Sequence, residues 1–81
     1  MSKMMRLDEM KPGESGTVAS VCSCGALRRR MMEMGLVKGA ELKVIRLAPS
    51  GNPVEVLLKG YSLALRREEA ANVTLEVDWI E

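Results

Sequence analysis

Residues 54–65 read VEVLLKGYSLAL, two short apolar runs with a turn signal between them. In the first run, residues 54–58, every second side chain is aliphatic, which is the pattern of a strand with one buried face. Residues 59–61 contain a glycine that turns the chain, and residues 62–65 are expected to return beside the first run as a second strand. This stretch predicts a domain built mainly from short β-strands.

Further strands are predicted on either side of this pair. Residues 16–21 and 41–47 carry side chains that favour strands, and residues 73–79 alternate between apolar and polar side chains. Residues 48–53 are expected to form a loop, because they hold prolines that a central strand would not tolerate. Residues 66–72 are expected to form a single helical turn. The aliphatic side chains expected to line the interior are Leu42, Val44, Val54, Val56, Leu58, Leu63, Leu65, Leu75 and Val77.

One helix is predicted between the first two of these strands, over residues 26–34. A helical rotation of about 100° per residue places three apolar side chains on one stripe that should face the core. Gly35 follows the helix and is the residue type preferred at a left-handed helix end. Leu36 should then fold back against the last turn. The core-facing stripe consists of Leu27, Met31 and Met34.

Short strands in this number predict a closed architecture. About five strands, with one helix inserted after the first, are expected to form a small barrel, because closure removes exposed strand edges. The chain shows no internal repeat, linker or low-complexity stretch. Residues 1–81 are therefore expected to form a single domain whose core extends over about residues 7–79.

The composition excludes several functional classes. The chain has twelve Lys and Arg residues and eleven Asp and Glu residues, so it lacks the basic excess typical of nucleic-acid-binding domains. No nucleic-acid partner is therefore expected. The chain has no histidine, the commonest general base, and we expect no enzyme. No apolar run resembles a secretory signal or reaches the ~20 residues of a membrane span. The predicted location is cytoplasmic, with the membrane reached only through a partner.

Several motifs follow one another in a specific order along the chain. They are Leu7 with Pro12-Gly13, Gly16-Thr17-Val18, the run RRMMEMGL at 29–36, Gly39-Ala40, APSGNP at 48–53 and LALRREEA at 63–70. Over residues 7–77 this order resembles the FeoA family, the small accessory proteins of bacterial ferrous-iron transport. The resemblance implies an SH3-like barrel and a cytosolic partner, the FeoB-type transporter with its GTP-binding domain. It predicts an accessory or regulatory protein that binds that transporter and modulates its assembly or activity.

The helix flank offers the best candidate for partner binding. Arg28, Arg29 and Met32 lie off the core-facing stripe, and exposed methionine beside arginine suits an adaptable protein-binding surface. Met32 could equally be a core-edge side chain covered by the loop at 49–53. Asn52, in that loop, stands where aspartate is usual in the family, and it is a further candidate contact. The oligomeric state is left open.

Two cysteines suggest an alternative function. Cys22 and Cys24 would supply two thiolates for Fe²⁺ or Zn²⁺ in a small metal-sensing or metal-carrying protein. A closed zinc site needs four ligands, however, and these two cysteines supply only two of them. The other interpretation is that Cys22 packs as a small hydrophobe and Cys24 sits in the turn before the helix. No cofactor is required for the accessory function.

Overall fold

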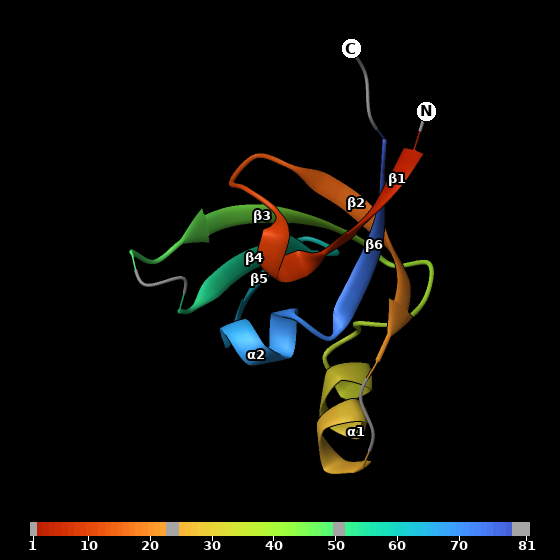
Figure 1. Ribbon diagram of the computed structural model, residues 1–81. Helices are drawn as coiled ribbons and strands as arrows, with labels where there is room; N and C mark the ends of the chain where they lie inside the picture. The colour runs from red at the N-terminus through yellow and green to blue at the C-terminus, as the bar shows by residue number, and fades with distance from the viewer. Residues whose placement is uncertain (1, 23–24, 50–51, 79–81) are drawn as a thin grey trace.

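The computed structural model describes residues 2–22, 25–49 and 52–78. Six strands and three short helices follow one another along this part of the chain (Figure 1). In chain order they are β1 (Ser2–Arg6), the 3-10 helix η1 (Leu7–Glu9), β2 (Ser15–Val21), α1 (Gly25–Glu33), β3 (Glu41–Leu47), β4 (Val54–Leu58), β5 (Tyr61–Leu65), α2 (Arg67–Ala70) and β6 (Val73–Asp78).

The strands form one antiparallel sheet in the order β1-β6-β2-β3-β4-β5, so the mainly-β prediction is confirmed. The predicted set of about five strands lacked β1. That strand reads SKMMR, and its burial pattern leaves four of the five side chains exposed, so no alternating apolar pattern marks it. It forms because β6 offers a partner along its whole length, from Ser2 opposite Asp78 to Arg6 opposite Thr74.

The sheet curls around its core without a complete ring of strand pairings. β1 and β5 are the two end strands, and no pairing among the described residues joins them, so the expected closed ladder is open at this point. η1 and α2 contact each other beside the core, and α1 projects from one end of the sheet (Figure 1). All the predicted interior side chains are buried except Leu63, which is half-buried.

Helix α1 ends as its sequence predicts. Gly35 has a φ of 93°, and its N–H donates to the Met32 carbonyl at 3.0 Å. The N–H of Leu36 donates to the Met31 carbonyl at the same distance, which completes a Schellman ending. Met31 and Leu36 are fully buried. This ending turns the chain back toward the sheet, and it sets the position of the helix flank described next.

Candidate functional site

Helix α1 is attached to the rest of the molecule by an ion pair near its C-terminal end. Arg30 Nη1 lies 2.8 Å from Glu69 Oε2 in α2. The Glu69 side chain is only 5% exposed, and its second oxygen accepts a hydrogen bond from the Arg66 N–H at 2.9 Å. Both carboxylate oxygens are therefore paired, as burial of a charge requires. The ion pair joins α1 to α2.

A second attachment lies at the end of α1. The Tyr61 hydroxyl, at the start of β5, donates a hydrogen bond to the carbonyl of Met34. A side chain at Gly35 would approach that hydroxyl to 3.3 Å, so the helix end and Tyr61 are closely packed. With Met31 buried beneath, these contacts hold the C-terminal half of α1 on the core. The opposite flank of the helix is left facing outward.

That outward flank carries a shallow hollow of about 440 Å³. Met32 is 53% exposed, so of its two predicted environments the exposed one is confirmed. The structure thus brings together three of the predicted contact residues, Arg28, Arg29 and Met32. Gly25 and Glu33 were not among the predicted site residues, although helical spacing places Glu33 one turn from Arg29. The hollow is lined by Gly25, Arg28, Arg29, Met32 and Glu33.

Asn52, the fourth predicted contact residue, is not among the residues that line this hollow. Its Oδ1 accepts a hydrogen bond from the backbone N–H of Arg67 at 2.7 Å, at the first residue of α2. In Figure 1 the end of β3 and the start of β4 lie at the left of the molecule, away from α1. Asn52 therefore fastens the loop between β3 and β4 to the start of α2 and does not line the hollow. A partner contact at Asn52 stays a prediction.

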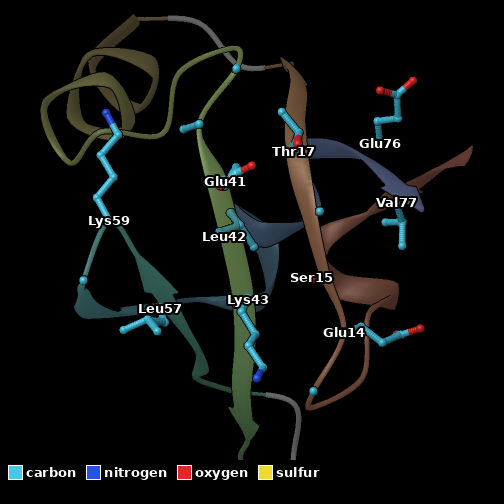
Figure 2. Close-up of a pocket in the computed structure, with 15 residues that line it drawn as sticks. Glu14, Ser15, Thr17, Glu41, Leu42, Lys43, Leu57, Lys59, Glu76 and Val77 are labelled. Carbon is cyan, nitrogen blue, oxygen red and sulfur yellow. The ribbon is translucent and has the colours of Figure 1, made fainter. Parts of the chain in front are cut away.

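A larger open depression of about 880 Å³ lies on the sheet where β2 and β3 meet. Figure 2 shows Lys59, Glu41 and Lys43 along one side of it and Glu76 and Glu14 along the other. Charges of both signs are therefore interspersed, and the depression presents no single-sign field that would select a charged ligand. The depression could not be predicted from the sequence, because segments distant along the chain assemble it: β2 and the turn before it, β3, β4 and the turn after it, and β6.

Comparison with known proteins identifies the family. The family model described as FeoA domain matches residues 5–77. This chain belongs to the FeoA family. The FeoA protein from Chlorobium tepidum is 48% identical, with a TM-score of 0.83 over 90% of this chain and 70% of that one. A FeoA from Stenotrophomonas maltophilia, described as a procaryotic SH3 domain protein and complexed with zinc, is 36% identical, with a TM-score of 0.75 over 91% and 89% of the two chains. The predicted SH3-like fold is confirmed.

A third relative is longer than this FeoA chain. The Fe(2+) transport protein A/Fe(2+) transporter FeoB fusion protein of Porphyromonas gingivalis is 37% identical over 73 residues. Those residues are 90% of this chain but only 9% of the fusion protein. In the described part of this chain, no helix is long and apolar enough to cross a membrane.

Of the two cysteines predicted to bind a metal, the structure describes Cys22. Cys22, directly after β2, is a free and exposed cysteine, so it does not pack in the core. Cys24 lies outside the described residues. Within the ranges that the structure describes, no three His, Cys, Asp or Glu side chains gather closely enough to hold a metal ion. Binding of Fe²⁺ or Zn²⁺ by the two cysteines stays a prediction.

Metal analysis of the purified protein tests that prediction. If Cys22 and Cys24 hold a metal, anaerobically prepared protein should contain about one Fe²⁺ or Zn²⁺ per chain, because thiolates bind these ions once a site is completed. The double variant Cys22→Ser, Cys24→Ser should lose it, whereas Ser20→Ala, beside the pair, should keep it. Equal metal content in the wild-type and double-variant proteins would exclude a cysteine site.

Proposed function

We propose that this FeoA acts as a non-catalytic cytosolic module that docks on a FeoB-type ferrous-iron transporter and modulates its assembly or activity. The observation that supports this most is the Porphyromonas gingivalis fusion, in which a segment 37% identical to this chain is covalently joined to FeoB. Covalent linkage holds two modules at high effective concentration, and it is useful where they engage each other. Engagement of the two modules requires a surface of this chain that contacts the transporter.

The outward flank of α1 is the surface that we propose for this docking. Arg28 and Arg29 lie beside the exposed Met32 in a hollow that is mostly apolar. Arginine and methionine are both enriched at protein interfaces. Methionine adapts its shape to the partner. The matching surface on the transporter would carry an apolar side chain for the hollow and acidic side chains for the two arginines.

The attachments of α1 give this surface a defined position before binding. The Arg30–Glu69 ion pair and the Tyr61 hydrogen bond hold the helix on the core, so little conformational freedom is lost on docking. FeoA would then change the transporter by binding one of its states more tightly than another, since a partner shifts an equilibrium only through differential affinity.

Titration with the cytosolic GTP-binding domain of the cognate transporter tests this proposal. Methionine-methyl and backbone NMR shifts should cluster on Arg28, Arg29 and Met32. Met32→Ala should weaken binding about 5- to 30-fold, the cost of about 1–2 kcal/mol typical of a central interface side chain. The double variant Arg28→Glu, Arg29→Glu should weaken it at least as much, with a strong dependence on salt.

Lys11→Glu provides the matched control, since Lys11 is exposed and lies on the turn before β2, outside the hollow. It reverses a charge at a distance from α1 and should leave the affinity unchanged. Binding with shifts on another face would discard the α1 surface but keep the docking. Absence of binding to the GTP-binding domain and to full-length transporter, with or without GTP, would contradict the proposed function itself.

A further inference from the structure

Strand β5 is an edge strand of the sheet that the described residues form. β4 pairs with one side of it along its whole length, from Leu58 opposite Tyr61 to Val54 opposite Leu65. No strand of the described chain pairs with its other side. Among the described residues, the backbone hydrogen bonds formed outside the strand pairings do not involve residues 62–65. The outer edge of β5 therefore presents free backbone donors and acceptors.

The two edges of this sheet differ in the side chains that protect them. Proteins commonly block an exposed edge strand with charged residues, with proline or with a bulge. β1 carries Lys3 and Arg6 within its five residues. β5 reads YSLAL, without a charge or a proline, and its pairing with β4 is regular throughout. β5 is therefore the edge that is open to a further strand.

The face of β5 that points away from the core also leaves room for an additional strand. Leu63 and Leu65 pair with the buried Val56 and Val54, so the side chains that alternate with them, Ser62 and Ala64, point to the other face. Both are small and exposed. A strand added beside β5 would meet no bulky side chain on that face.

Basic residues mark both ends of this uncharged strand. Lys59 precedes β5 in the turn from β4, and Arg66 and Arg67 follow it; all three side chains are exposed. Of the nearby carboxylates, Glu55 pairs with Arg46 at 3.5 Å and Glu69 pairs with Arg30. Glu68 offsets only one of the two arginines. Each end of the strand therefore carries at least one exposed basic side chain, Lys59 at one end and Arg66 and Arg67 at the other.

We propose that β5 accepts an extended acidic segment of a partner chain as an additional strand. The segment would have about five uncharged residues, matched to a strand that rises about 3.3 Å per residue, and Asp or Glu at both ends. Backbone hydrogen bonds to the open edge hold it, and the basic residues at the two ends select for acidic flanks. This surface is separate from the α1 flank, and the inference does not rest on transporter docking.

Synthetic peptides test this directly on the full chain. The probe is a blocked peptide of about nine residues, with paired glutamates at each end and alternating valine and threonine between them. It should shift the amide signals of residues 62–64 and slow their hydrogen exchange. Two consecutive N-methyl groups at its centre, which block both edges of the peptide, should weaken binding at least about tenfold because backbone hydrogen bonds are lost. Lysines in place of the glutamates should weaken it similarly.

Two protein variants complete the test. Ala64→Glu adds a negative charge to the open edge and should weaken binding of the glutamate peptide, whereas Met4→Glu on the β1 edge should not. Equal affinity for the N-methylated peptide would show that no strand is added and would overturn the proposal. Shifts confined to β1 or α1, or no binding of the glutamate peptide at millimolar concentration, would overturn it as well.

Discussion

Arg30→Ala is expected to lower the free energy of unfolding by about 2–3 kcal/mol, whereas Arg28→Ala and Arg29→Ala should each change it by less than about 0.5 kcal/mol. Arg30 is the cation that pairs with the buried carboxylate of Glu69. Without it, that carboxylate keeps only the Arg66 N–H and stays away from water. The expected cost lies below that of a fully buried pair, because the Arg30 side chain is itself 58% exposed.

Urea denaturation of the three single variants measures this difference. For a chain of this size, Arg30→Ala should also lower the melting temperature by about 10–20 °C. The double variant Arg30→Ala, Glu69→Ala should be more stable than the sum of the two single changes predicts, since removal of both partners leaves no unpaired buried charge. Equal stability of the three arginine variants would mean that the ion pair contributes nothing in solution.

Gly16→Ala is expected to cost about 2–3 kcal/mol, although alanine usually stabilises a strand relative to glycine. A Cβ at this position would lie 2.8 Å from the backbone carbonyl oxygen of Glu76 and 3.1 Å from Val77 Cγ2. The nearer atom belongs to the backbone of β6, which pairs with β1 on one side and β2 on the other, so it cannot move aside locally. β2 and β6 would have to separate.

Thermal unfolding of Gly16→Ala should show a melting temperature lower by about 10–20 °C. Ser15→Thr is the matched control, because it adds one methyl group at the neighbouring, exposed position of the same strand. It should change the stability by less than about 0.5 kcal/mol. A Gly16→Ala protein as stable as the wild type would show that β2 and β6 are less closely packed than the structure describes.

Much of the fold follows from patterns within a few residues. The bounds predicted for β3 and β4 agree with the structure to the residue, since their alternation of buried and exposed side chains is local. The ending of α1 at Gly35 was likewise predictable from one glycine after an apolar stripe. β1 was not predictable, because its side chains are mostly exposed and its partner β6 lies at the other end of the chain.

In the candidate site, too, some features could be predicted from local sequence patterns and others could not. Helical spacing alone placed Arg28, Arg29 and Met32 on one flank, and the structure shows them around one hollow. Spacing could not show that Arg30 is engaged, because its partner Glu69 is 39 residues away in the sequence. Nor could it place Asn52, whose hydrogen bond to the start of α2 depends on how the loop packs.

The sequence by itself determined the mainly-β class, most strand positions, the end of α1 and the residues of its outward flank. Only the tertiary structure decided which arginine pairs with a buried carboxylate, why position 16 has no room for a side chain, and which sheet edge stays open. The physical reason is the distance along the chain between the residues that interact. Turn chemistry and side-chain periodicity act over a few neighbouring residues, whereas ion pairs, close backbone approaches and sheet order join segments that only the folded chain brings together.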